Sequence, residues 1–318
     1  MDIEKIKKHI NDVLIETNFK GLGKKRVGKV RDIYTEKDHV TLVATDRHSS
    51  FDRNIAYVPF KGEILNQISL FWFEKTKDII KNHILSTPDP NVVVAKKCTP
   101  LPIECVMRGY ITGVTSTSLW THYKEGKRDF GNFILPEGLK KNQKLSEPIF
   151  NPTTKSDEHD RPITKKEIVN EGLLSQEMID KVENTAKALF KRGQEIALKQ
   201  GLILVDTKYE FGLDEKGELT LIDEIHTPDS SRYWKAVSYD ERFNNNEEPE
   251  YFDKEFLRLW FKDNCDPYKD KVLPKAPEHL VAELSRRYIE IYETITSKKF
   301  NHDFSQTTTE RITKNLKK

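Results

Sequence analysis

Residues 201–234 read GLILVDTKYEFGLDEKGELTLIDEIHTPDSSRYW. The run from Leu202 to Val205 is continuously apolar, which is typical of a strand buried on both faces. The run continues into an alternation that places Asp206, Lys208 and Glu210 on one face of the strand. Because three ionisable side chains beside a buried run are costly without partners, this face predicts a binding site.

A second alternating strand is predicted over residues 218–225, after a turn at Lys216 and Gly217. If those two residues form the turn, Glu210 lies opposite Asp223. Directly opposed carboxylates repel each other, so a divalent cation is expected between them. Magnesium fits best, because it commonly uses one or two carboxylates together with substrate phosphates. The alternative is a surface hairpin with another register, in which both carboxylates are solvated.

Composition bounds the class of protein. The chain has 318 residues, a net charge of +2, 36% hydrophobic and 33% charged residues, which predicts a globular protein of one large or two ordinary domains. The balanced charge gives no reason to expect nucleic acid or membrane partners, and the charged first residues do not resemble a signal peptide. Three cysteines without metal-ligand spacing predict free thiols in a reducing cytoplasm.

The N-terminal third contains a glycine-bearing basic hairpin. Apolar spacing predicts a helix over residues 2–17, then a strand over 27–34 that carries Gly28, Lys29 and Arg31, and a return strand over 40–45. Such a hairpin can cover nucleotide phosphates, as the glycine loop of kinases does. The alternative is a basic hairpin on the surface, since neither nucleotide-binding glycine pattern is matched.

The rest of the chain alternates strands and helices. A polar cluster at 46–53 follows the hairpin. A hydroxyl-rich turn at 112–119 is either an anion site or a helix cap. Thr164 with Glu167 is predicted to form a capping box. Residues 129–160 are expected to be a long irregular loop, and residues after 301 to be frayed. The predicted helices are 63–81, 178–200, 252–262 and 277–298, and further strands are predicted at 91–97 and 103–110.

Seven segments together resemble one family, SAICAR synthetase. They are GKVRDIY at 28–34, TDRHSSFDR at 45–53, PIECVMRGY at 102–110, LPEGL at 135–139, KLSEPIFNPTTKSDEHD at 144–160, LVDTKYEFGLD at 204–214 and DEIHTPDSSRYW at 223–234. The segments occur in the family's order and span most of residues 20–240. The chain is similar to the longer form of the family, with added C-terminal helices.

The resemblance implies a fold and a reaction. The fold is α+β with two lobes: an antiparallel β lobe that resembles the kinase small lobe, expected over residues 1–105, and a larger α/β lobe with C-terminal helices over 106–318. The reaction joins L-aspartate to the carboxylate of carboxyaminoimidazole ribonucleotide (CAIR), with ATP and Mg²⁺, to give SAICAR in purine biosynthesis. Since a carboxylate is a poor acyl donor, an acyl phosphate intermediate is expected. The added C-terminal helices favour a monomer over a homodimer.

The resemblance also implies roles for residues. Residues expected to contact the reacting groups are Lys208, Asp206 and Asp46. Residues expected to bind ATP are Gly28, Lys29, Arg31, Glu104 and Val106. Residues expected to bind the other substrates are Arg108, Ser116, Arg232 and Asp229. The metal ligands are Glu210 and Asp223, which agrees with the hairpin argument. One departure is Val114, where the family usually has a serine.

Three other functions make different predictions. Another ATP-dependent kinase or ligase on the same fold would transfer phosphate without forming SAICAR, but no protein-kinase catalytic motif is present. A regulatory protein with a degenerate nucleotide site would have lost the Glu210 and Asp223 pair. An RNA-binding module would need a basic stripe with interleaved aromatics, and only residues 24–31 form a local basic patch.

Overall fold

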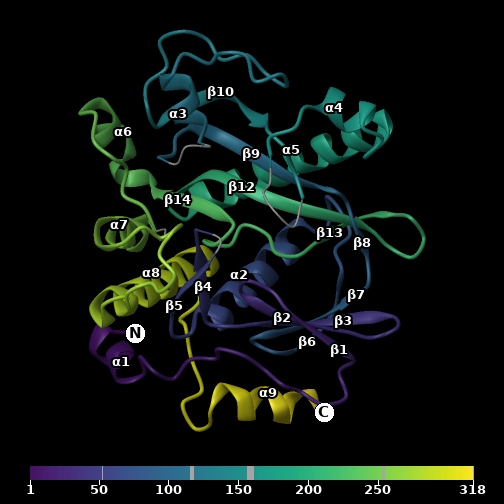
Figure 1. The fold of residues 1–318 in the computed structure, drawn as a ribbon, viewed down its shortest axis with the longest axis vertical. Coiled ribbons are helices and arrows are strands. Elements are labelled where there is room, and N and C mark those ends of the chain that lie inside the picture. The colour runs from purple at the N-terminus through teal and green to yellow at the C-terminus, as the bar shows by residue number, and fades with distance from the viewer. Residues whose placement is uncertain (52, 115–117, 156–160, 253–254, 318) are drawn as a thin grey trace.

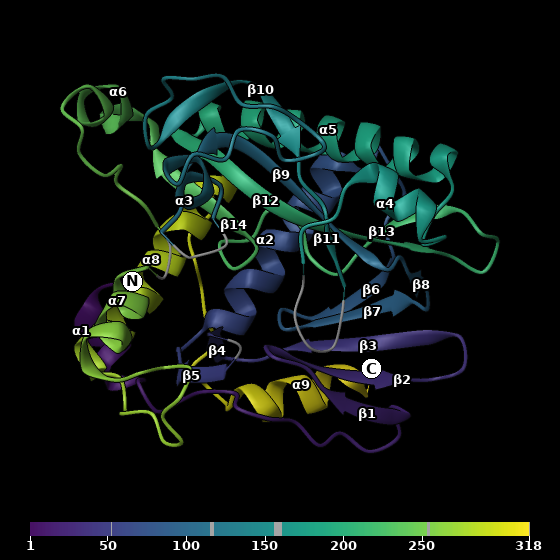
Figure 2. The ribbon, with the colours of Figure 1, turned by 45° about the horizontal axis from the view of Figure 1, so that its top comes forward.

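The computed structural model describes residues 1–318 except 52, 115–117, 156–160, 253–254 and 318. A small antiparallel sheet has the strand order β1-β2-β3-β7-β6. Its strands are β1 (Lys24–Val27), β2 (Arg31–Thr35), β3 (His39–Ala44), β6 (Ile84–Asp89) and β7 (Val92–Lys96). Beside it lie the hairpin of β4 (Arg47–Ser50) and β5 (Arg53–Tyr57), and helix α2 (Lys61–Thr76). Figure 2 shows α2 between this sheet and a larger one.

The larger sheet is built around β12 (Leu202–Leu213). Antiparallel neighbours flank β12 on both sides: β9 (Ile103–Ile111) and β14 (Ser231–Lys235) along its first half, and β13 (Leu219–Ile222) and β8 (Thr99–Pro100) along its second half. Strands β10 (Gln143–Phe150) and β11 (Thr153–Thr154) extend the sheet beyond β9. The long helix α5 (Gln176–Lys199) covers its outer face, and Gly201 ends that helix with φ 75° (Figure 2).

The remaining helices surround these sheets. They are α1 (Ile3–Lys8), α3 (Leu119–Lys124), α4 (Lys165–Asn170), α6 (Ala236–Asn244), α7 (Glu255–Asn264), α8 (Glu278–Thr296) and α9 (Thr308–Leu316). Helix α8 packs against α1, α2 and α7, and α9 lies against the small sheet, on the far side from α2 (Figures 1 and 2). The two-lobed α+β fold with C-terminal helices is therefore confirmed. In the described part of the chain, no helix combines the length and apolar character that a membrane crossing requires.

Tertiary contacts override local patterns at both ends of the chain. The N-terminal helix ends at Lys8 rather than near residue 17, because Leu14 donates its backbone N–H to Asp46 (2.7 Å) and Thr17 donates to Asp32 (2.7 Å). The expectation of a frayed C-terminus is wrong. Helix α9 begins with a capping box at Thr307 and inserts Ile312 into the core of the small lobe.

Two other expectations need correction. The predicted strand over 27–34 is interrupted by a tight turn, in which the Gly28 N–H donates to the Arg31 carbonyl at 2.8 Å. The region 129–160 is not wholly irregular, because β10 lies within it and pairs with β9. A break in register between Lys144 and Ile149 hides the alternation of β10 in the sequence. The capping box at Thr164 and Glu167 is confirmed.

Candidate active site

Three strands bring Arg108, Asp206 and Arg232 into one row. Asp206 of β12 is paired in register with Arg232 of β14 on one side and Arg108 of β9 on the other. Its carboxylate accepts a hydrogen bond from Arg232 Nε at 3.1 Å (Oδ1), forms an ion pair with Arg232 Nη2 at 2.7 Å (Oδ2), and lies 3.7 Å from Arg108 Nη1. Burial lowers the pKa of Arg108, which Asp206 only partly offsets. The row holds two guanidinium groups around one carboxylate, an arrangement suited to an anionic ligand.

Lys208 lies two residues further along the same face of β12 and forms ion pairs with two carboxylates. Its Nζ lies 2.5 Å from Glu104 Oε1 on β9 and 3.5 Å from Glu210 Oε1. Burial opposes its charge, but Glu104 and Glu210 outweigh burial and raise the pKa of Lys208. Lys155 also forms an ion pair with Glu210. The predicted shared face of Asp206, Lys208 and Glu210 is therefore present, and its partners are charged groups of β9 and β14 and Lys155, directly after β11.

The predicted pairing of Glu210 with Asp223 is wrong by one residue. Glu210 lies opposite Ile222, because the hairpin turns through three residues, 215–217, rather than two. Gly217 adopts φ 74° at the end of this turn, a typical three-residue hairpin conformation. Asp223 itself leaves the strand with φ 68°. It still reaches the neighbourhood of Glu210, since the charge of Lys208 acts on both carboxylates.

Arg31 of the small lobe reaches across to this group. Its guanidinium forms a fork with Asp223, with Nη1–Oδ1 at 2.8 Å and Nη2–Oδ2 at 2.9 Å, and Nη2 lies 3.7 Å from Glu224. Burial would raise the pKa of Asp223, but Arg31 and then Lys208 lower it. Burial raises the pKa of Glu224, which Arg31 only partly opposes. A small-lobe cation and larger-lobe carboxylates thus meet between the two sheets.

The turn that joins β1 and β2 carries Gly28 and Lys29. A Cβ on Gly28 would lie 2.9 Å from the Arg31 carbonyl oxygen, so only glycine allows this close approach. Lys29 is exposed at the tip of the turn. Arg47 holds the turn from below, donating to the carbonyl of Gly28 (3.0 Å) and to that of Lys29 (3.3 Å).

The polar cluster after β3 is mostly turned inward. The Asp46 carboxylate is buried and accepts from the backbone N–H groups of Leu14 (2.7 Å) and Gly62 (2.9 Å). Burial raises the pKa of Asp46 to about 6, against these hydrogen bonds and the charge of Lys61. Ser50 accepts from Arg258 Nε at 3.2 Å, and Arg258 lines the neighbouring cavity. This cluster thus reaches the cavity through Ser50.

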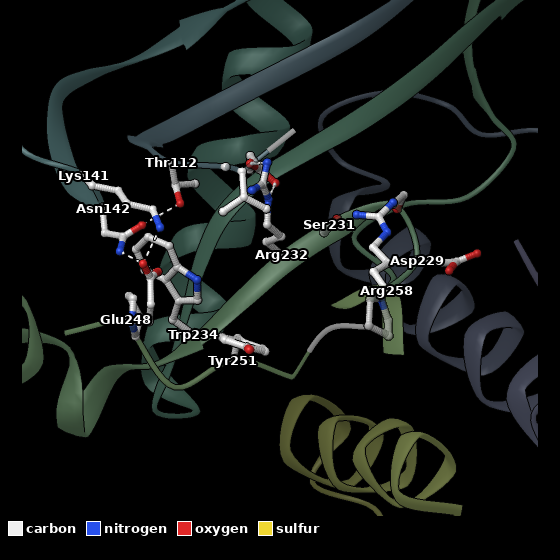
Figure 3. Close-up of a pocket in the computed structure, with 16 residues that line it drawn as sticks. Thr112, Lys141, Asn142, Asp229, Ser231, Arg232, Trp234, Glu248, Tyr251 and Arg258 are labelled. Atoms are coloured by element: carbon white, nitrogen blue, oxygen red, sulfur yellow. Dashed lines mark hydrogen bonds and ion pairs between the residues drawn. The ribbon is translucent and has the colours of Figure 1, made fainter. Parts of the chain in front are cut away.

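A cavity of about 240 Å³ opens beside the row of arginines. Its lining includes Asp206, Asp229, Arg232, Arg258 and the exposed Val114. Figure 3 shows Asp229 at one end of this group and the Lys141, Asn142 and Glu248 cluster at the other, with Arg232 and Arg258 between them. The predicted substrate residue Ser116 lies outside the described residues.

Two of the residues expected to bind ATP, Glu104 and Val106, lie on β9. Val106 pairs in register with Lys208, and its carbonyl accepts from the Asn151 N–H at 2.8 Å. Glu104 instead directs its carboxylate to Lys208. Contact of either residue with ATP stays a prediction.

Four charged residues of the site were not predicted. Lys155 lies in the family segment 144–160, and Glu224 lies in the family segment 223–234, directly after Asp223. Arg258 lies on α7 and lines the cavity. Lys61 lies at the start of α2 and forms an ion pair with Asp229, with 3.2 Å between Nζ and Oδ2. No local sequence signal identifies these two, because their positions depend on the packing of distant helices.

Cations and carboxylates meet between a small antiparallel sheet and a larger sheet, an arrangement suited to an enzyme that binds nucleotide phosphates together with a second anionic substrate. The SAICAR synthetase family model matches residues 24–275, and the chain belongs to that family. Its activity is that of an ATP-dependent ligase, which joins L-aspartate to CAIR in purine biosynthesis.

Named relatives are similar in sequence to this chain over nearly its whole length. The phosphoribosylaminoimidazole-succinocarboxamide synthase of Legionella pneumophila (strain Paris) is 56% identical over 290 residues, which cover 91% of this chain and 93% of the relative. The chloroplastic synthase of Arabidopsis thaliana is 55% identical, covering 93% and 73%. The SAICAR synthase of Saccharomyces cerevisiae, solved in complex with SAICAR, is 32% identical with a TM-score of 0.78, covering 91% of this chain and all of that one.

Proposed function

We propose that the charged face of β12 activates CAIR by transfer of the ATP γ-phosphoryl group to its carboxylate. The observation that carries this proposal is the row Asp206, Lys208 and Glu210, in which each side chain is paired with an opposite charge: Arg232 of β14, Glu104 of β9, and Lys155 directly after β11. The acyl phosphate is then attacked by the amine of L-aspartate. The protein supplies positioning and charge neutralisation, so no covalent nucleophile is required.

The small lobe binds the phosphates of ATP. Gly28 and Lys29 lie in the turn that covers them, and Arg31 extends from the same turn toward the carboxylates of the larger lobe. Adenine lies along Glu104 and Val106 of β9. The rigid anchoring of the turn by Arg47 supports this assignment, because a preformed loop loses little entropy on binding.

Glu210 and Asp223 would hold Mg²⁺. Their carboxylate oxygens are the donors that this ion prefers, and two of them suffice when substrate phosphates supply further ligands. Among the described residues there is no group of three or more His, Cys, Asp or Glu side chains placed to hold a metal ion. When bound, the ion supplies positive charge to the phosphates. Arg31 and Lys155, which pair with these carboxylates here, are then available to the phosphates as well.

The ribonucleotide lies on the arginine row and the adjoining cavity. Arg108 and Arg232 bind its phosphate, Asp206 binds ribose hydroxyl groups, and Lys208 binds the reacting carboxylate. Ser116 and Asp229 complete the substrate contacts. For Asp46, the buried carboxylate supports a positioning role for the start of α2 rather than direct contact with the reacting groups.

The test measures ADP release with ATP, Mg²⁺ and CAIR, with and without L-aspartate, and detects SAICAR by mass. SAICAR formed in equal amount with ADP only when L-aspartate is present supports the ligase with these roles. ADP released with a phosphorylated product and no SAICAR would instead support the alternative, a small-molecule kinase on the same fold.

We further propose a monomer that works in the cytoplasm. The three cysteines are all free thiols, which suits a reducing compartment, and α8 and α9, C-terminal helices that the resemblance implies shorter family members lack, pack onto the rest of the chain. Light scattering at micromolar concentration tests the monomer, and a doubled mass would contradict it. The division between lobes at residues 105 and 106 also remains a proposal.

A further inference from the structure

A lysine is fully buried where α2 begins. Lys61 has 0% of its side chain exposed, and its Nζ lies 3.2 Å from Oδ2 of Asp229, whose side chain is 9% exposed. Moving both charges out of water costs several kcal/mol, and such pairs often stabilise a fold no better than apolar residues of the same size. The position of Asp229 at the substrate cavity therefore suggests that this pair serves the reaction.

The loop that carries Asp229 is fixed on both sides of it. The Thr227 hydroxyl donates to Glu224 Oε2 at 2.9 Å and lies 3.3 Å from the Asp229 N–H, which donates to it. On the other side, the Ser230 carbonyl accepts from the backbone N–H of Lys208 at 3.2 Å. The loop thus connects the metal-side carboxylate Glu224 with Lys208, the proposed contact of the reacting carboxylate.

Asp229 lies between the two halves of the site. Its charge acts on Glu224, and Figure 3 shows it at the end of the cavity beyond Arg258. L-aspartate enters with one ammonium and two carboxylate groups. A carboxylate here suits the ammonium group, and the adjacent guanidinium of Arg258 suits a carboxylate group. The opposite orientation would place like charges together.

We propose that Lys61 is a positioning residue that holds Asp229 ionised and oriented, so that Asp229 binds the ammonium group of L-aspartate beside the activated carboxyl group. This inference rests on the proposed function, since it uses the same acyl phosphate. A carboxylate has about four acceptor positions, so one carboxylate can bind both a lysine and the ammonium group of a substrate.

The proton balance gives Asp229 a defined task. The ammonium group carries three protons and the product amide carries one, so two protons leave. Asp229 receives the first, which frees the nitrogen lone pair to attack the acyl carbon. The C–N bond forms, the C–O bond to phosphate breaks with its electron pair on the phosphate oxygen, and the leaving phosphate takes the second proton.

The test is a double-mutant cycle with Lys61→Met, Asp229→Asn and the double variant, assayed for kcat/KM with L-aspartate and for KM of ATP. Each single variant is expected to lower kcat/KM for L-aspartate by about tenfold to hundredfold, as loss of a charge-assisted hydrogen bond does. The double variant is expected to be no worse than Asp229→Asn alone, because Lys61 acts through Asp229. The KM of ATP is expected to change less than threefold.

Hydroxylamine in place of L-aspartate separates this role from the activation of CAIR. It is a largely uncharged nucleophile at pH 7.5 and needs no ammonium contact, so Lys61→Met is expected to lose much less of its rate of hydroxamate formation than of its rate with L-aspartate. If the wild type itself forms none, the acyl phosphate proposal fails, and the cycle with L-aspartate alone decides the role of Lys61.

Lys165→Met is the matched control. Lys165 also pairs with two carboxylates, Asp180 and Glu183, both at 2.6 Å, but it lies at α4 and α5 and lines no part of the cavity. Multiplicative losses in the double variant, or equal losses with hydroxylamine and L-aspartate, would overturn the proposal. The double variant removes both buried charges, so it remains informative where Lys61→Met alone folds poorly.

Discussion

Replacing Asp223 with asparagine tests whether the carboxylates between the lobes serve phosphoryl transfer. The substitution breaks the fork with Arg31, whose two bonds measure 2.8 and 2.9 Å, and turns an amide N–H₂ group toward a guanidinium that can only donate. It also removes one of the two proposed magnesium ligands. We expect kcat to fall by at least about a hundredfold, which is about 2.7 kcal/mol of transition-state stabilisation.

The cost to folding is expected to be smaller. The Asp223 and Arg31 side chains are both partly open to solvent, so loss of the fork lowers the free energy of unfolding by about 1–2 kcal/mol. Kinetics of ADP release over a magnesium titration, together with urea unfolding, separates the two effects. The variant is expected to remain folded at 25 °C and to require more magnesium for half-maximal rate.

Asp78→Asn is the matched control for this experiment. Asp78 forms the same kind of fork with Arg192, at 3.0 and 2.9 Å, but lies on the surface after α2 with 62% of its side chain exposed. Its loss is expected to leave turnover unchanged. Near-normal turnover of Asp223→Asn with an unaltered magnesium requirement would refute the assignment of this carboxylate to the metal.

Three further predictions concern the row of arginines, the C-terminal helix and the buried Asp46. Arg232→Ala is expected to raise the KM of CAIR much more than that of ATP in steady-state kinetics, and equal effects would contradict a ribonucleotide contact. Arg311→Met removes the ion pairs of Arg311 with the buried Glu63 and Asp89, at 3.0 and 3.1 Å, and is expected to lower the free energy of unfolding by about 3–5 kcal/mol in urea. A loss below about 1 kcal/mol would contradict a stabilising role for these pairs. Burial raises the pKa of Asp46 from 3.8 to about 6. The free energy of unfolding of the wild type, relative to that of Asp46→Asn, is therefore expected to fall as the pH rises from about 4 through 6. A difference that does not change with pH would indicate a normal pKa for Asp46.

The central strand was predictable because its signal is local. A buried apolar run followed by alternating charges places Asp206, Lys208 and Glu210 on one face whatever the rest of the chain does. Their partners on β9 and β14 could be assigned only through family resemblance, since sequence spacing does not specify which strands become neighbours. The structure brings Arg108 and Arg232 to Asp206 by pairing both strands with β12.

Register was less predictable than strand identity. A two-residue turn and a three-residue turn differ by one residue, and that difference moves Asp223 out of the position opposite Glu210. The backbone φ of 74° at Gly217 selects the longer turn. Asp223 nevertheless joins the site, because it leaves the strand and is held by Arg31 of the other lobe.

Residues whose role depends on long-range packing were not predictable. Lys61 and Arg311 are both charged, and a charged residue in a sequence is normally assigned to the surface. Each is buried here because carboxylates from distant segments surround it: Asp229 for Lys61, and Glu63 and Asp89 for Arg311. The apolar pattern after residue 301 is too sparse to show that α9 covers the small sheet.

The geometry of β12 explains how one strand can serve two substrates. Residues two apart on one face of a strand are separated by about 6.8 Å, so Asp206 and Glu210 lie about 13–14 Å apart along the strand. Arg108 and Arg232 lie beside Asp206. Lys155 pairs with Glu210, and Arg31, which is paired with Asp223, lies close enough for the charge of Glu210 to act on it. Lys208 lies midway between Asp206 and Glu210. A ribonucleotide phosphate bound at one end and ATP phosphates at the other would therefore place the carboxylate to be activated near Lys208, beside the loop that carries Asp229.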